Sequence, residues 1–167
     1  MRVYGVTGWK NAGKTGLMER LVAEFRSRGL TVSTVKHAHH AFDVDQAGTD
    51  SFRHRAAGAG QVLLSSSRRW ALMTELGDAP EPGLDRLLAQ LAPCDLVLVE
   101  GFKTAGHPKI EAHRAVTGQP LIAPGDMSVR AVASDSALTL DRPVFDLDDT
   151  AAIADFIAAD LNLEPGS

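Results

Sequence analysis

Apolar and polar positions follow two periods along this chain, one typical of strands and the other of helices. Short apolar runs predict strands at residues 3–6, 31–35 and 95–100, and residues 15–28 place four apolar side chains on one helical face. The same criteria predict further strands at residues 61–65, 69–74, 109–113, 129–133 and 145–147, and helices at residues 50–58, 84–91 and 150–161. Because strands and helices alternate, we expect an α/β fold: a three-layer sandwich with a mostly parallel central sheet and helices on both faces.

Length and charge narrow the classes of function. A chain of 167 residues has the size of one ordinary domain, so a single domain over residues 1–167 is expected. The formal charge of -4, from 17 basic and 21 acidic residues, gives no broad attraction for nucleic acid or for an anionic membrane. One cysteine cannot form an internal disulfide, and the N-terminus carries no signal-peptide pattern, so the expected location is the cytoplasm.

A glycine-rich segment connects the first predicted strand to the first predicted helix. Residues 8–15 match the pattern G-x-x-x-x-G-K-[ST], which forms a P-loop when it lies between a strand and a helix. Glycines allow the backbone amides to turn toward phosphate oxygens, and the helix N-terminus adds partial positive charge. The predicted phosphate-binding residues are Gly8, Trp9, Lys10, Asn11, Ala12, Gly13, Lys14, Thr15 and Gly16. The alternative is a glycine-rich turn that precedes a helix and binds nothing.

Three residues of this segment have individual interpretations. Lys14 would reach the β- and γ-phosphates as a catalytic residue, and the Thr15 hydroxyl would bind Mg²⁺. Lys10 is interpreted as a phosphate-steering or solvated charge. A lysine that reaches a neighbouring subunit's nucleotide would instead lie five residues before the loop lysine, and that position is Trp9.

The apolar run at residues 95–100 has an acid at each end. Only its carboxyl end shares an edge of the sheet with the phosphate loop, so Glu100 is the predicted catalytic acid and Mg²⁺ ligand. Asp95 is expected to cap the start of the strand. The alternative for Glu100 is a salt bridge with Lys103 at the edge of the loop.

A polar segment rich in histidine and aspartate follows the second predicted strand. It should open at the same edge, in the position where switch loops contact the γ-phosphate and the metal. Asp45 or Asp43 could complete the Mg²⁺ shell, and Asp45 is the predicted ligand. A transition-metal cluster, contact with phosphate or substrate, and plain loop polarity all remain open for the histidines. The candidate ligand-binding residues are Lys36, His37, His39 and His40.

Five blocks of sequence occur in a characteristic order along the chain. They are Gly-Trp opening residues 8–15, Lys-His-Ala-His-His at 36–40, Asp-Val-Asp at 43–45, Arg-Trp-Ala-Leu-Met-Thr-Glu at 69–75 and Val-Glu-Gly-Phe-Lys at 99–103. Together they resemble the molybdopterin-guanine dinucleotide biosynthesis protein B family, known as MobB, with weaker similarity at residues 131–135. The resemblance implies a P-loop NTPase fold.

The same resemblance implies a function. It implies a homodimeric GTP-binding protein with weak GTPase activity that uses GTP and Mg²⁺ and acts in molybdenum cofactor biosynthesis. Its partners would be molybdopterin and the nucleotidyltransferase that joins GMP to molybdopterin. Asp135 stands where many GTP-binding proteins place a base-reading acid, but the Asn and Lys of the usual Asn-Lys-x-Asp are missing, so the choice of GTP over ATP rests on the resemblance.

Two other functions would use the same loop. One is a small-molecule kinase, against which the absence of an evident arginine-rich lid argues: the candidate arginines Arg53, Arg55, Arg68 and Arg69 are scattered over different predicted elements. The other is a nucleotide-binding adaptor in which the nucleotide has only a structural role.

Overall fold

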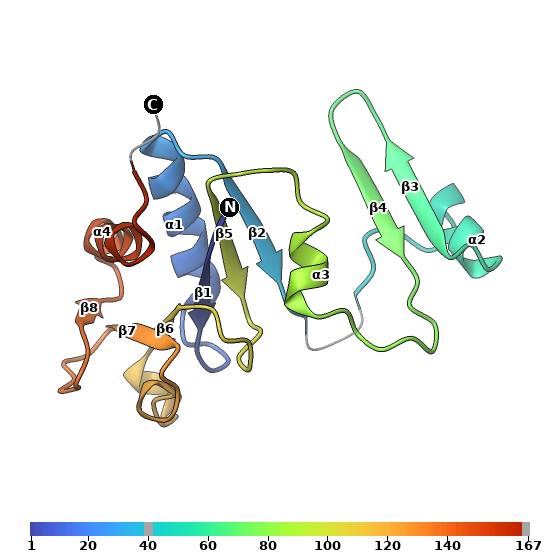
Figure 1. Cartoon of the computed structure of the whole chain (residues 1–167). Helices are drawn as coiled ribbons and strands as arrows, with labels where there is room; N and C mark the ends of the chain where they lie inside the picture. Colours follow the sequence, from blue (N-terminus) through green and yellow to red (C-terminus); the bar gives the residue numbers. More distant parts are fainter. Residues whose placement is uncertain (39–41, 165–167) are drawn as a thin grey trace. The chain divides into compact units, whose positions relative to one another are not determined.

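Six parallel strands form the main sheet of the protein (Figure 1). The structure is a computed structural model that describes residues 1–38 and 42–164. Their order in the sheet is β2-β5-β1-β6-β7-β8, and each neighbouring pair is parallel. The chain passes from β1 toward β2 on one side and later from β5 to β6 on the other, so the order switches at β1. Ligands of such sheets bind beyond the carboxyl ends of the strands at this switch. The strands are β1 (Arg2–Thr7), β2 (Val32–Lys36), β5 (Leu96–Glu100), β6 (Lys109–His113), β7 (Val129–Ser134) and β8 (Val144–Asp146).

Helices cover both faces of this sheet. Leu96 and Leu98 of β5 are fully buried in a core shared with α1 (Lys14–Ser27) and α4 (Thr150–Leu161). The alternate residues of β5, Val97 and Val99, pack on the opposite face with α3 (Leu84–Leu88). The four apolar residues of β5 therefore lie between two helical layers, and the expected three-layer fold is confirmed.

The chain packs as two compact units, each with its own sheet. The six-stranded sheet belongs to residues 1–37 and 84–167, and residues 38–83 form the second unit. The second unit holds α2 (Asp50–Ala56) and the antiparallel hairpin of β3 (Gln61–Ser65) and β4 (Trp70–Thr74). This packing does not test whether the units fold independently, so the single domain over residues 1–167 stays a prediction.

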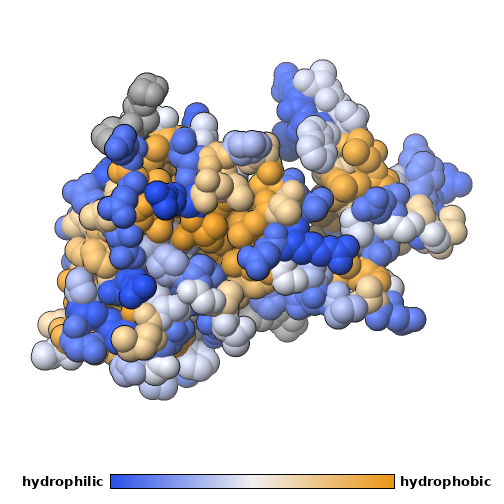
Figure 2. Space-filling view, viewed as in Figure 1, coloured by the Kyte–Doolittle hydropathy of each residue, from blue (hydrophilic) through white to orange (hydrophobic). Residues whose placement is uncertain are grey.

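One face of the hairpin is apolar and exposed. Leu63 and Leu72 lie opposite each other in the register and are 61% and 42% exposed, and Trp70 is 66% exposed. Figure 2 shows apolar side chains on the visible face of this hairpin. A two-stranded ribbon is marginally stable in water by itself, so this face would gain stability from being covered.

Most predicted elements occur within a few residues of their expected positions. The strand at 61–65 and the helix at 150–161 have the expected bounds, whereas α3 ends three residues earlier than the predicted helix. The sequence pattern did not predict the short 3-10 helices η1 (Ala115–Thr117) and η2 (Ala123–Gly125). Within the described residues, no helix is both long and apolar enough to cross a membrane.

Candidate nucleotide site

The loop at residues 8–15 follows the carboxyl end of β1 and leads into α1. Its backbone takes positive φ angles at Gly8 (140°), Asn11 (65°) and Gly13 (94°), a region that favours glycine and tolerates asparagine. A Cβ at Gly8 would overlap the carbonyl oxygen of Ala112 on β6, so this position has room only for glycine. Gly13 is the N-cap of α1, and the amides of the first helical turn have no acceptor within the helix.

Trp9 contacts two lysine ammonium groups. The Nζ of Lys14 donates to the carbonyl oxygen of Trp9 at 2.7 Å, and the Nζ of Lys103 lies 4.5 Å from the centre of the Trp9 ring. The indole Nε1 of Trp9 in turn donates to the carbonyl oxygen of Pro120 at 2.7 Å. Burial lowers the pKa of Lys14, and the charges of Lys103 and Lys36 lower it further, whereas Glu100 opposes the shift.

Two of the three predicted metal residues lie close together: Thr15 in the first turn of α1 and Glu100 at the end of β5. Thr15 Oγ1 lies 3.5 Å from Glu100 Oε1, and the Glu100 side chain is only 12% exposed. Lys36, opposite Glu100 in the register of β2 and β5, places its Nζ 3.5 Å from Glu100 Oε2. The ion pair of Glu100 is therefore with Lys36, and the alternative pairing with Lys103 is not the one in this structure.

The chain turns sharply after Glu100. Gly101 and Phe102 have φ angles of 94° and 48°, and the ring of Phe102 lies 4.9 Å from that of His37. A Cβ at Gly101 would come within 2.8 Å of the Cβ of His37, whose amide donates to the Glu100 carbonyl oxygen at 2.9 Å. His37 thus packs beside the site, whereas His39 and His40 lie outside the described residues.

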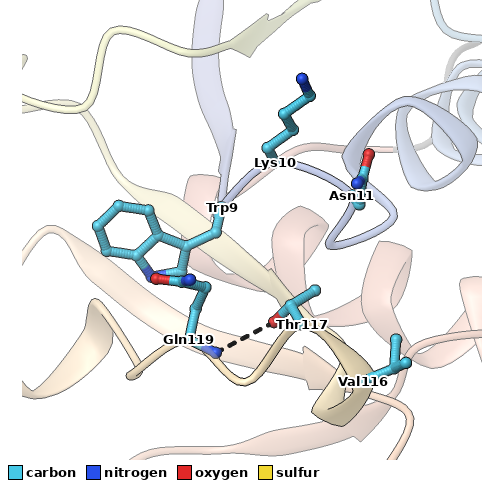
Figure 3. Close-up of a pocket in the computed structure, with 6 residues that line it drawn as sticks. All are labelled: Trp9, Lys10, Asn11, Val116, Thr117 and Gln119. Atoms are coloured by element: carbon cyan, nitrogen blue, oxygen red, sulfur yellow. Dashed lines mark hydrogen bonds between the residues drawn. The ribbon is translucent and has the colours of Figure 1, made fainter.

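The 8–15 loop forms one wall of a pocket, and residues 114–120 form a second wall that the sequence did not predict. This pocket of about 490 Å³ lies between the two segments (Figure 3). Asp135 Oδ1 accepts the amide of Ala115 at 2.8 Å, and the buried Glu111 accepts the amides of Ile122 and Ala123 at 2.9 and 2.8 Å. The polar, aperiodic sequence of this stretch gave no signal for the wall. The pocket is lined by Trp9, Lys10, Asn11, Val116, Thr117 and Gln119.

Asp45 belongs to the second unit, where it is an ion-pair partner. Its Oδ1 lies 2.5 Å from an Nη atom of Arg55, a residue that also pairs with Asp43 and Glu75. The hydrogen bond from Arg55 lowers the pKa of Asp45. The assignment of Asp45 to Mg²⁺ stays a prediction. Among the described side chains, no group of three or more His, Cys, Asp or Glu is placed to hold a metal by itself.

The sheet order, with its switch at β1 and a glycine-rich loop leading into α1, defines a P-loop NTPase-like fold. The chain belongs to the MobB family: the family described as Molybdopterin guanine dinucleotide synthesis protein B matches residues 3–135. The resemblance seen in the sequence blocks is therefore confirmed.

Relatives of known sequence and structure agree with this membership. A Molybdopterin-guanine dinucleotide biosynthesis adapter protein of Haemophilus influenzae is 45% identical over 93% of this chain and 86% of its own length. The protein of the same name from Escherichia coli K12 is 41% identical over 89% of this chain and 87% of its own. The crystal structure of Bacillus subtilis MobB has a TM-score of 0.76 at 25% identity, over 98% of this chain and all of that one.

Proposed function

We propose that this protein binds GTP with Mg²⁺ on the 8–15 loop and hydrolyses it weakly, as an adapter in molybdopterin guanine dinucleotide biosynthesis. It would act beside the nucleotidyltransferase that attaches GMP to molybdopterin. The two relatives most similar in sequence among those described above are named as adapter proteins of this biosynthesis. The transferase, the nucleotide and the hydrolysis are part of the proposal.

The observation that carries the proposal is the meeting of Thr15 and Glu100 beside Lys14. A hydroxyl and a carboxylate oxygen 3.5 Å apart are hard oxygen donors of the kind that Mg²⁺ prefers. Glycine at position 8 allows the loop backbone to lie close to β6, where a Cβ would overlap the Ala112 carbonyl oxygen. The donor set and the loop therefore fit a magnesium nucleotide.

Each residue of the site has a proposed role. Lys14 would exchange the Trp9 carbonyl for oxygens of the β- and γ-phosphates, and Lys36 would balance charge beside Glu100. Thr15 and Glu100 would hold Mg²⁺, which when bound supplies neutralisation of the phosphate charge. Glu100 would also orient the attacking water, and no stronger base is needed for slow hydrolysis.

The guanine base of the nucleotide would lie near the end of β7. Asp135 follows that strand, and one of its carboxylate oxygens already accepts the Ala115 amide, so the other oxygen has the greater remaining capacity to read a guanine. One carboxylate without the usual Asn and Lys supports modest discrimination. We therefore expect GTP to bind more tightly than ATP, by a smaller margin than in proteins with the full Asn-Lys-x-Asp motif.

We also propose that the protein is a cytoplasmic homodimer. The exposed apolar face of the hairpin, formed by Leu63, Trp70 and Leu72, supports association with a second copy, because water contact with apolar surface is unfavourable. The charge of -4 supports the expectation that neither nucleic acid nor a membrane is a partner.

One assay tests the function. The purified protein is incubated with Mg²⁺ and GTP or ATP, with and without molybdopterin and the transferase, and phosphate release and dinucleotide formation are followed. Slow GTP hydrolysis and faster dinucleotide formation are expected. Stoichiometric phosphorylation of a metabolite would indicate a kinase instead, and tight binding without turnover would indicate an adaptor that uses the nucleotide structurally.

Two variants locate the activity. Lys14→Ala should weaken GTP binding strongly, because it removes the charge that reaches the phosphates. Arg86→Ala is the matched control, since Arg86 is an exposed cation on α3 in the same unit. Equal affinity of the Lys14 variant and the control would remove the assignment of the loop.

A further inference from the structure

Both ammonium groups on Trp9 rest on neutral partners. Lys14 is bonded to the Trp9 carbonyl oxygen, and Lys103 lies over the Trp9 ring. A carbonyl dipole and a ring face attract a cation less strongly than an anion does. A phosphate that binds near Lys14 and Lys103 can therefore replace Trp9 as the partner of both ammonium groups.

The backbone before Lys103 is shaped to bring that residue back over the loop. Gly101 and Phe102 are consecutive residues with φ angles of 94° and 48°. A positive φ costs conformational energy at a phenylalanine, and such strain persists only where surrounding contacts maintain it. The ring contact between Phe102 and His37 is one such contact. The turn thus holds the exposed side chain of Lys103 against the Trp9 ring instead of letting it project into solvent.

The local charges are unbalanced. Lys36 and Lys103 are both close enough to Lys14 to lower its pKa, and Glu100 is the acid that acts in the opposite direction. Lys36 also forms an ion pair with that same carboxylate. Three cations around one acid leave an excess of positive charge, which a multiply charged anion would neutralise.

We propose that Lys103 is a phosphate-binding residue. Its ammonium group rests on the Trp9 ring in the free protein and moves to the terminal phosphate of a nucleoside triphosphate when the nucleotide binds. This inference rests on the proposed function and deepens it. The terminal phosphate is the expected target because Lys103 follows β5, the strand that ends in the proposed metal ligand Glu100. The Trp9 ring loses its cation in this exchange and so reports the presence of that phosphate.

The test uses Trp9 as its own probe. The chain has two tryptophans, so Trp70→Phe leaves Trp9 as the only one. In this background, Trp9 emission is followed during titration with a nonhydrolysable GTP analogue and with GDP, each with Mg²⁺, and dissociation constants are measured by calorimetry. Lys103→Met removes the charge, Lys103→Arg keeps it, and Arg86→Ala controls for the loss of one exposed cation.

The expected result is selective. Lys103→Met should weaken the GTP analogue about tenfold and GDP much less, because one charge-assisted contact to the terminal phosphate is lost. Lys103→Arg should restore most of the affinity. The analogue should change Trp9 emission in the parent and leave it nearly unchanged in Lys103→Met.

Two outcomes would overturn the inference. One is equal affinity of Lys103→Met and Arg86→Ala for the analogue, and the other is the same emission change in Lys103→Met as in the parent. If Lys14→Ala still abolishes binding in either case, the proposed nucleotide site stands and only the role of Lys103 is lost. If Lys14→Ala binds normally, the proposed function itself fails.

Discussion

Gly8 in the loop after β1 lies directly against the carbonyl oxygen of Ala112 on β6. The contact leaves no space for a Cβ, and the φ angle of 140° at Gly8 is one that side chains disfavour. Gly8→Ala should therefore destabilise the protein by about 1–3 kcal/mol and reduce nucleotide binding. Urea unfolding measures the first effect and calorimetry the second. Gly106→Ala is the control, because a Cβ at Gly106 meets open space, and its unfolding free energy should be nearly unchanged.

Glu100→Gln tests the metal site. The substitution keeps the shape of the side chain and removes the charge that would hold Mg²⁺ with Thr15. Magnesium binding to the nucleotide complex should weaken about 10- to 100-fold. GTP affinity is measured over a range of Mg²⁺ concentrations, with Asp85→Asn on the surface of α3 as the control. An unchanged Mg²⁺ dependence would assign the metal to other residues.

Glu111→Ala tests a buried carboxylate that anchors the chain just after residues 114–120. The Glu111 carboxylate is fully buried and accepts the amides of Ile122 and Ala123. Its removal leaves buried donors unpaired, and a loss of about 3 kcal/mol in unfolding free energy is expected. Glu24→Ala breaks a surface ion pair with Arg28 and should cost less than about 1 kcal/mol. Similar losses in the two variants would contradict the anchoring role.

His107 should make stability depend on pH. Burial and the charge of Lys109 lower the pKa of His107 to about 4, while Asp126 opposes the shift. Neither ring nitrogen has a hydrogen-bond partner in the described part of the chain. The unfolded chain takes up this proton near the ordinary pKa of 6.5 and the folded protein only near 4, so stability is full above about pH 6.5 and falls between these values.

The pH effect has a direct measurement. Unfolding free energy is compared at pH 7 and pH 4.5, where the loss due to His107 should be about 2 kcal/mol. His107→Leu should remove that part of the loss. His54→Leu, at an exposed position of α2, should retain it. A full loss in His107→Leu would show that other groups are responsible.

Leu72→Lys tests the proposed dimer. A charge placed in the exposed apolar face of the hairpin, opposite Leu63, should shift the protein toward monomer, because its burial between two copies is unfavourable. Sedimentation equilibrium over a range of concentrations gives the mass. Met127→Lys, at a residue 79% exposed in the other unit, should leave the mass unchanged. Identical masses for the two variants would place the interface elsewhere.

Where local pattern alone decides the structure, the sequence predicted it well. The run from Leu96 to Val99 is apolar on both faces and became a fully buried central strand. Asp95 caps the start of that strand by accepting the amide and hydroxyl of Thr31. The N-cap of α4 is Asp149, whose side chain accepts the Ala152 amide.

Contacts between distant residues were not predictable in the same way. Just after residues 114–120, the amides of Ile122 and Ala123 donate to the buried Glu111. From sequence alone, a carboxylate in a strand is expected at the surface until its amide partners are known. The pairing of Glu100 with Lys36 depends on the register of two strands whose paired residues are 64 positions apart in sequence. A salt bridge between Lys103 and Glu100 was the alternative interpretation of Glu100. Two consecutive residues with positive φ angles precede Lys103, which lies over the Trp9 ring.

The double hydrogen bond from Thr31 to Asp95 has a consequence at the opposite end of the sheet. It fixes the alignment of β2 and β5 at their amino ends. At their carboxyl ends, about 16 Å along the strands, this alignment places Lys36 opposite Glu100. A slip by one position would turn Lys36 to the other side of the sheet. Loss of the contact between Thr31 and Asp95 would therefore disturb the nucleotide site even with every residue that contacts the nucleotide unchanged.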